Sequence, residues 1–282
     1  MVGGITTAYA KQVPASDSRP YALPVDEERL LGGNTHADVV RVADTVRRPT
    51  GFWTPGVAAL LHHLQTRGYE SAPRHLGTDE QVREILTFVP GSVVWPDHFA
   101  LVATDEALAQ VAATIRRYHD AVAEFPHEGF TWSDRGADPR GPHEVLCHND
   151  LAPWNLVHSP SKQWTFIDWD LAAPGRLAWD LSLGLLSFVP LMADSTLDEA
   201  ATRHRISVFS TGYGKALPAN VLAVAVERCA HEADRIERFG TEGIEPYARL
   251  LADGHLPVWR AAATHIAAHQ PSWQAAVDAT AA

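Results

Sequence analysis

Short runs rich in β-branched residues, separated by turn residues, mark the first third of the chain and are typical of β-strands. Strands are expected at Val39–Val42 and Thr45–Arg48, joined by a tight turn at Ala43-Asp44. Two more strands are expected at residues 73–78 and 83–89. Together these segments predict one small sheet near the N-terminus.

An amphipathic helix is predicted between the two pairs of strands, over Trp53–Arg67. Thr54 can serve as its N-cap, Pro55 suits the first helical position, and Gly68 ends it. The apolar positions that share one face are Val57, Leu60, Leu61 and Leu64. This helix contains no acidic residue.

The remainder of the chain is predicted to be mainly helical. A first helix is expected at Thr104–Ala123, with a buried stripe made of Leu108, Val111, Ile115 and Tyr118. Further helices are expected over residues 177–189, 198–216, 219–239 and 257–281. Loops are expected at residues 125–142, a stretch rich in Pro, Gly and Asp, and at residues 172–176.

A cluster of polar residues stands out between residues 147 and 170 because the segments around it are apolar. Those segments are residues 146–147, residues 156–157 and a buried-strand candidate at residues 164–167. The polar members are His148, Asp150, Asn155, Asp168 and Asp170. A buried carboxylate is costly without a partner, and a divalent cation is one such partner because hard cations favour oxygen ligands. A hairpin whose Asp and Asn side chains cap turns is the alternative interpretation.

The spacing of these polar residues matches a catalytic loop for phosphoryl transfer. A protein-kinase loop reads H-R-D-L-x-x-x-N, and a metal-holding Asp follows on a nearby strand. Residues 148–155 read HNDLAPWN, and Asp168 stands where that metal-holding Asp would stand. The form without the Arg resembles the aminoglycoside phosphotransferase and choline kinase-like family, whose loop is H-G-D-x-x-x-x-N followed by I-D-[WF]. The departure is Asn149 for Gly, and Asn tolerates unusual backbone angles better than most residues.

This resemblance implies an α+β fold of the bilobal, protein-kinase-like kind. It predicts a small N-terminal antiparallel sheet lobe with one helix at residues 1–91, in which residues 1–20 form a tail. A larger, mainly helical C-terminal lobe then covers residues 92–282 and contains the acceptor pocket. Phe88 and Val89 resemble the link between the lobes, whose backbone groups hydrogen-bond an adenine ring. A plain turn after an edge strand is a compatible interpretation.

The resemblance also assigns residues to the nucleotide phosphates. Gly32, Gly33 and Asn34 are assigned to a loop over them, although the full G-x-G-x-x-G is absent and an ordinary hairpin turn is the alternative. Kinases place a Lys on the third strand, where this chain has only Arg47 and Arg48. Only one of the two can face the cleft. Relatives with a similar Arg-Pro ending favour Arg48, and a pair of surface arginines is the alternative.

For the polar cluster, the resemblance implies Mg²⁺-dependent transfer of a phosphoryl group from ATP or GTP. Asp150 would accept the hydrogen bond and the proton of the attacking hydroxyl, while His148 would brace the loop. Asn155 and Asp168 would hold Mg²⁺ between them. Asp170 is either a further metal contact or a structural acid.

Outside the cluster, Asp180 lies at the start of the helix predicted at residues 177–189. Relatives carry a similar acid that steadies the catalytic loop, and the alternative is an acid that favours the helix dipole. His265 and His269 are spaced i and i+4, which can suit a metal. They lack the adjacent Glu of H-E-x-x-H, so a solvated helix face is the favoured interpretation.

Charge and composition exclude several classes of function. The 23 basic and 34 acidic residues give a net charge of −11, which argues against a general nucleic-acid-binding surface. The two cysteines, Cys147 and Cys229, cannot form a disulfide framework and favour a reduced, cytoplasmic protein. No apolar run reaches the roughly 18 residues of a membrane helix, and the first residues lack the pattern of a signal peptide.

The predicted partner is a small molecule with a hydroxyl group, either a metabolite or an antibiotic. The family acts on aminoglycosides, choline, homoserine and sugars, and an aminoglycoside pocket is usually acidic. Residues 199–253 hold eight acids and seven bases, which does not indicate a site for a polycation. A non-catalytic nucleotide-binding or toxin-immunity protein on the same fold is the alternative, supported by the missing helix Glu and strand Lys. A protein kinase is disfavoured because no activation segment ending in A-P-E is present.

Overall fold

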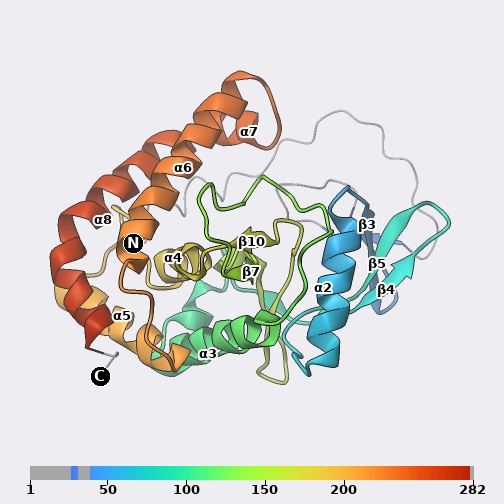
Figure 1. The fold of residues 1–282 in the computed structure, drawn as a ribbon, viewed down its shortest axis with the longest axis horizontal. Coiled ribbons are helices and arrows are strands. Elements are labelled where there is room, and N and C mark those ends of the chain that lie inside the picture. The colour runs from blue at the N-terminus through green and yellow to red at the C-terminus, as the bar shows by residue number, and fades with distance from the viewer. Residues whose placement is uncertain (1–26, 31–38, 280–282) are drawn as a thin grey trace.

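The computed structural model describes residues 27–30 and 39–279 and shows an α+β architecture (Figure 1). A small antiparallel sheet with one helix, α2, forms the N-terminal part, and helices dominate the C-terminal part. The predicted fold class is therefore confirmed. The predicted phosphate loop at Gly32, Gly33 and Asn34 lies outside the described residues.

The N-terminal sheet has five strands in the order β1-β2-β3-β5-β4, and every pairing is antiparallel. The strands are β1 (Glu28–Arg29), β2 (Val40–Val42), β3 (Thr45–Pro49), β4 (His75–Thr78) and β5 (Arg83–Thr87). The predicted turn between β2 and β3 is confirmed, with Ala43 at a φ of 53°. This sheet places β3 at its centre, between β2 and β5.

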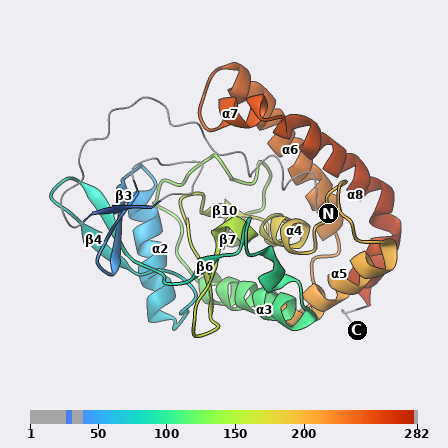
Figure 2. The ribbon, with the colours of Figure 1, turned by 180° about the vertical axis from the view of Figure 1, so that it is seen from behind.

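Helix α2 (Thr54–Thr66) packs beside this sheet and buries the predicted apolar face (Figures 1 and 2). The prediction of Thr54 as its N-cap was wrong, because the cap position is Trp53 and carries no side-chain cap hydrogen bond. The Thr54 hydroxyl instead accepts a hydrogen bond from the Gly51 N–H at 2.9 Å. Its oxygen therefore stabilises the turn before the helix, while Pro55 is the second residue of the helix, one position later than predicted.

Two small sheets lie in the middle of the molecule and frame the polar cluster (Figure 2). One has the order β6-β8-β9, with β6 (Ser92–Val93), β8 (Leu156–His158) and β9 (Trp164–Phe166). The other pairs β7 (Val145–Cys147) with β10 (Ala173–Gly175). Residues 172–176 were predicted to be a loop, and this was wrong. The short segment pairs with β7, a long-range contact that turn-rich local sequence does not reveal.

The C-terminal helices surround these strands. They are α3 (Asp105–Val122), α4 (Leu177–Phe188), α5 (Glu199–Tyr213), α6 (Val221–Thr241), α7 (Tyr247–Ala252) and α8 (His255–Asp278). Short 3-10 helices occur at η1 (Phe99–Val102) and η2 (Pro153–Asn155). Four of the predicted helices are confirmed within a few residues, and α8 begins two residues early, at His255. Helix α7 was not predicted. Helices α6 and α8 run side by side along one edge of the molecule (Figures 1 and 2).

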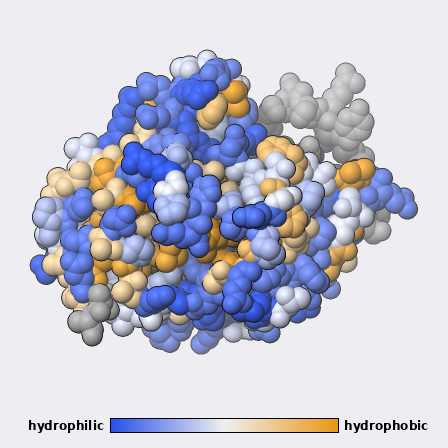
Figure 3. Space-filling model, in the orientation of Figure 1, coloured by the Kyte–Doolittle hydropathy of each residue, from blue (hydrophilic) through white to orange (hydrophobic). Residues whose placement is uncertain are grey.

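One large hydrophobic core joins the two parts, since it includes the buried face of α2 together with residues of α3, α4, α6 and α8. The face of the molecule in Figure 3 is mostly hydrophilic and shows only scattered hydrophobic patches. No helix among the described residues is long and apolar enough to cross a membrane. Cys147 and Cys229 are both buried, and neither takes part in a disulfide.

The link between the two parts passes through Gly91. Its φ of 147° is a conformation that side chains rarely allow, and a Cβ atom there would lie 2.3 Å from the carbonyl oxygen of His158. The link therefore runs directly against β8, the strand that follows residues 148–155 of the polar cluster.

Candidate active site

The polar cluster forms a loop between β7 and β8, continued by the end of β9. Antiparallel pairing of β8 with β9 places Leu156 opposite Phe166. The Ile167 N–H also donates to the Asn155 carbonyl oxygen at 2.9 Å. The hairpin thus brings Asp168 to the same end of the strands as Asn155. The sequence predicted this proximity, and the strand register explains it.

Asp150 is held from both sides by hydrogen bonds to its carboxylate. The Trp154 indole N–H donates to Oδ1 at 3.1 Å, and the Asn155 side-chain amide donates to Oδ2 at 2.7 Å. Burial raises the pKa of Asp150 to about 7, with a further contribution from the negative charge of Asp168. A carboxyl group that titrates near neutral pH is suited to accept a proton from a substrate.

His148 supports the loop from inside the core. It is completely buried, and burial lowers its pKa to about 4, so the imidazole is neutral at neutral pH. Its Nδ1 accepts a hydrogen bond from the Asp150 backbone N–H at 3.2 Å. The ring lies 4.3 Å from that of Trp169, between centroids. These contacts fit the predicted bracing role and leave the ring facing away from solvent.

Asn149 occupies the position where the family motif has Gly. Its φ of 65° is left-handed, which is the conformation that explains a Gly at this position. The Asn149 side-chain amide donates to the carbonyl oxygen of Leu171 at 2.8 Å, a bond that Gly cannot make. Its own carbonyl oxygen accepts from the buried Arg228 guanidinium at 2.5 Å. The substitution therefore keeps the loop conformation and adds a contact.

Asp180 on α4 anchors the same loop. Its carboxylate accepts hydrogen bonds from the backbone N–H groups of His148 at 3.0 Å and Asn149 at 2.7 Å. The His119 ring nitrogen lies 3.0 Å from the same carboxylate. Burial would raise the pKa of Asp180, but the hydrogen bond and charge of His119 outweigh it and the pKa is lowered. Asp180 thus contacts the loop directly, which agrees with the interpretation that this acid steadies the loop.

Arg48 on β3 points into the site and meets three carboxylates. Its guanidinium lies 2.6 Å from Glu84, 2.6 Å from Asp170 and 3.5 Å from Asp168, measured nitrogen to oxygen. Burial alone would lower the pKa of Arg48, but the three carboxylates raise it. Arg47 lies on the other face of the strand, where its nitrogen is 3.7 Å from Asp79. The alternation of the strand therefore turns Arg48 toward the polar cluster and Arg47 away from it.

Glu84 is a residue of this site that the sequence analysis missed. It lies directly opposite Arg48 in the pairing of β3 with β5, and only 2% of its surface is exposed. Kinases take the partner of their strand lysine from a helix, and α2 has no acidic residue. Here the partner comes from the adjacent strand. The sequence signal for Glu84 was an acidic residue at a position of β5 whose alternation pattern points toward the interior.

The backbone of Phe88, one of the two predicted adenine contacts, already takes part in a hydrogen bond. The Phe88 backbone N–H donates to the Asp44 carbonyl oxygen at 2.8 Å, so it belongs to the sheet. The Phe88 ring lies under the Arg41 guanidinium at 4.0 Å. The Phe88 N–H is therefore already used within the protein.

The predicted metal ligands differ in exposure. The Asp168 side chain is 37% exposed and that of Asp170 only 8%, the latter against Arg48. Asp168 has a φ of 60°, a strained conformation of the kind that clusters at functional sites. Within residues 27–30 and 39–279, no group of three His, Cys, Asp or Glu side chains could hold a metal ion by itself. Mg²⁺ usually binds one or two carboxylates together with substrate phosphates and water.

His265 and His269 form no such group either. Their rings lie tilted against each other with centroids 4.3 Å apart, and the His269 ring stacks on that of Trp273 at 5.0 Å. The His269 Nδ1 lies 2.9 Å from the carbonyl oxygen of His265. The pair is therefore half-buried and packed along α8 against Trp273, so the predicted helix face is only partly solvated.

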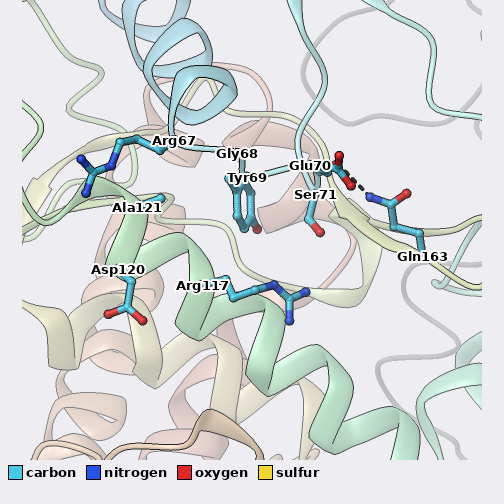
Figure 4. Close-up of a pocket in the computed structure, with 9 residues that line it drawn as sticks. All are labelled: Arg67, Gly68, Tyr69, Glu70, Ser71, Arg117, Asp120, Ala121 and Gln163. Carbon is cyan, nitrogen blue, oxygen red and sulfur yellow. Dashed lines mark hydrogen bonds between the residues drawn. The ribbon is translucent and has the colours of Figure 1, made fainter.

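A separate hollow of about 540 Å³ lies between the end of α2, helix α3 and the turn between β8 and β9 (Figure 4). Its wall includes Arg117 and Asp120 of α3, and the Gln163 amide donates to the Glu70 carbonyl oxygen at 3.0 Å. Asp120 is already paired with Arg116. No member of the polar cluster lines this hollow, so it is distinct from the candidate site.

Two comparisons identify relatives of the chain. The trifolitoxin immunity protein of Rhizobium leguminosarum bv. trifolii is 32% identical over 200 residues, which cover 67% of this chain and 75% of that protein. A model of the phosphotransferase enzyme family matches residues 130–218, the part that contains the polar cluster. The chain belongs to the phosphotransferase enzyme family. Members of this family transfer phosphoryl groups to alcohol acceptors.

Solved structures of phosphotransferases share the fold. The GDP complex of wild-type aminoglycoside 2'-phosphotransferase-IIIa has a TM-score of 0.57 and 16% identity, covering 86% of this chain and 93% of that one. The AMP-bound complex of a spectinomycin phosphotransferase has a TM-score of 0.58 and 12% identity, covering 84% and 92%. At such identities the likeness shows the fold, and the two structures show that nucleotides bind to relatives with it.

Proposed function

We propose that this chain is a Mg²⁺-dependent phosphotransferase that moves the γ-phosphoryl group of ATP or GTP to a hydroxyl group of a small metabolite or antibiotic. The observation that carries the proposal is the convergence of Asp150, Asn155 and Asp168 at one end of the β8–β9 hairpin, with Arg48 beside them. Phosphoryl transfer depends mainly on positioning and charge stabilisation, which such a set can supply.

The proposal assigns each of these residues a role in the reaction and names the atom that performs it. Asp150 accepts the hydrogen bond of the attacking hydroxyl and takes its proton at a carboxylate oxygen. Asn155 uses its amide nitrogen on Asp150, so its amide oxygen is the atom that suits a cation. Asp168 supplies an exposed carboxylate, and these two residues would hold Mg²⁺. Bound there, the cation would neutralise charge on the nucleotide phosphates.

The remaining assignments concern the nucleotide. Arg48 would bind the phosphates through its planar guanidinium, and Asp170 would orient Arg48 or add a metal contact. Gly32, Gly33 and Asn34 would cover the phosphates, with Val89 and the Phe88 carbonyl against the base. These assignments divide the chain near Gly91 into a nucleotide lobe, residues 1–91, and an acceptor lobe, residues 92–282.

A thermal-shift experiment tests the proposal first. ATP or GTP with Mg²⁺, at about 100 times its Kd, should add about 2.7 kcal/mol to the free energy of unfolding, since it binds only the folded state. Asp168→Asn should lose the part of the shift that depends on Mg²⁺. Asp134→Asn, an exposed acid in the loop before β7, is the control and should keep it. The absence of any shift with either nucleotide would contradict the proposal.

The Arg48–Glu84 pair provides a second test. Glu84→Gln should raise the nucleotide Kd about tenfold, because Arg48 loses the charged partner on β5 that holds its guanidinium in place and keeps only Asp170 and Asp168. Asp79→Asn is the matched control, since it removes a partner of Arg47 on the opposite face of the same strand. Isothermal titration calorimetry measures both. Equal nucleotide affinity in Glu84→Gln and wild type would show that Glu84 has only a structural role.

A second candidate function is immunity to a toxic compound without catalysis, favoured by the similarity to the trifolitoxin immunity protein. The test is protection of trifolitoxin-sensitive cells by wild-type chain and by Asp150→Ala. Protection that survives this substitution supports a non-catalytic role. Protection lost in the variant, with the folded protein still present, supports immunity through phosphorylation.

A further inference from the structure

A second cavity, of about 510 Å³, opens beside the catalytic loop in the C-terminal part. Its walls come from the segment before and within η1, from η2, from the end of α4 with the loop that follows, and from α5 and α8. Its volume is that of a site for a drug-sized ligand. Neither the nucleotide residues nor Asp168 lines it.

The cavity reaches the candidate base through one residue. Trp154 of η2 lines the cavity and donates its indole N–H to Asp150 Oδ1 at 3.1 Å. Pro153, its neighbour, also lines the cavity. A molecule that lies against the Trp154 ring is therefore one side chain away from the carboxylate that would take its proton.

The inner wall of the cavity is apolar and rich in aromatic rings. The rings belong to Trp95, Phe99, Trp154 and Trp259, and Met192 adds a flexible apolar contact. The rings of Trp95 and Phe99 meet edge to face with centroids 5.6 Å apart. Such a wall favours flat, apolar ligands that stack on indole rings.

The charged residues of the cavity do not make it a site for a polycation. Its two carboxylates, Asp97 and Asp194, belong to exposed residues. The buried Arg205 has its guanidinium committed to the backbone carbonyl oxygens of Val102, Ala103 and Phe188, at 3.2, 2.7 and 2.9 Å. A polyamine would meet this buried cation without a buried carboxylate to balance its own charge.

We infer that the acceptor of this phosphotransferase is a hydroxyl-bearing molecule with an apolar, aromatic body and at most one charge, bound in this cavity with its hydroxyl directed past Trp154 toward Asp150. This inference rests on the proposed function for the transfer step and on the cavity for the class of ligand. In that step the hydroxyl oxygen bonds to the γ-phosphorus, the bond from that phosphorus to the bridging oxygen breaks, and the hydroxyl proton goes to Asp150.

Two apolar alcohols, 2-naphthylethanol and oestradiol, serve as probes, and neomycin serves as the polycationic comparison. Calorimetry measures their binding, and release of ADP or GDP measures transfer. Ala100→Trp, at an exposed position on the cavity wall, should fill the cavity and abolish binding of both alcohols. Trp259→Ala should weaken their binding about tenfold by removing one stacking surface. Arg117→Ala alters the separate hollow of Figure 4 and should change nothing.

The outcomes separate the ligand class from the transfer reaction. If an alcohol binds and is phosphorylated, and Ala100→Trp abolishes its binding, the result supports both the ligand class and the proposed function. The same binding without transfer supports the ligand class and contradicts the proposed function. Transfer to neomycin with no binding of either alcohol overturns the ligand class and keeps the proposed function. Failure of both alcohols to bind, or binding that Ala100→Trp leaves intact, also overturns the inference.

Discussion

Asp150→Ala is expected to lower the turnover number by about 10²–10⁴-fold and to leave the Kd for nucleotide within about threefold of wild type. A positioned general base contributes an effect of this size, and its loss does not remove a contact to the nucleotide. The alanine also removes the acceptor of two hydrogen bonds, from Trp154 and Asn155, so Asp150→Asn is made alongside it. Initial rates of nucleoside diphosphate release, with an acceptor found by screening, measure turnover.

The control for this experiment is Asp134→Asn, an exposed acid that should retain wild-type turnover. Circular dichroism and the melting temperature show whether each variant is folded. A folded Asp150→Ala protein with near-full turnover would exclude Asp150 as the base. A loss of nucleotide binding equal to the loss of turnover would instead assign Asp150 to binding.

Asp180→Ala is expected to lower the free energy of unfolding by about 3–5 kcal/mol, the range for removing one partner of a buried pair. Asp180 is completely buried, and its loss would leave the backbone N–H groups of His148 and Asn149 and the ring of His119 without their acceptor. Chemical denaturation measures the change. Turnover should also fall, since the catalytic loop loses its anchor. Asp134→Ala, at an exposed acid in the loop before β7, is the control. A change below about 1 kcal/mol, the range typical of surface sites, would contradict the anchoring role.

The pH dependence of stability gives an independent check on Asp180. Its pKa in the folded protein lies below its ordinary value, so the folded state favours the charged carboxylate. The resulting stabilisation is fully present above the ordinary carboxyl pKa of about 3.9 and is lost as pH falls through the lower folded pKa. The difference in stability between wild type and Asp180→Asn should therefore be constant from pH 5 to pH 7 and shrink below about pH 4. A difference that grows on acidification would have the wrong sign for this mechanism.

Local patterns in the sequence predicted most of the elements. The periodicity of apolar residues located α2, α3 and α4, and turn chemistry located the β2–β3 hairpin. The pattern failed at β10, because its few residues pair only with distant β7 and carry no alternation of their own. It also failed at α7, a helix of six residues and therefore too short for a periodicity to emerge.

The sequence by itself also determined the candidate catalytic set. The spacing from His148 to Asn155, followed by Asp168 after the next strand, is a local property that places these side chains together once the hairpin forms. Strand alternation likewise predicted that only one of Arg47 and Arg48 faces the cleft, and resemblance to relatives favoured Arg48. Alternation alone did not decide which face of the strand turns inward.

Only the tertiary structure decided the partners of these residues. Glu84 is 36 residues from Arg48 and Asp180 is 32 residues from His148, and both contacts depend on how separate elements pack. The same holds for the cavity beside η2, whose walls come from segments between Trp95 and Trp259. Periodicity and motif spacing record the conformation of one segment at a time, whereas the charge balance of a buried arginine and the shape of a cavity arise from segments meeting in space.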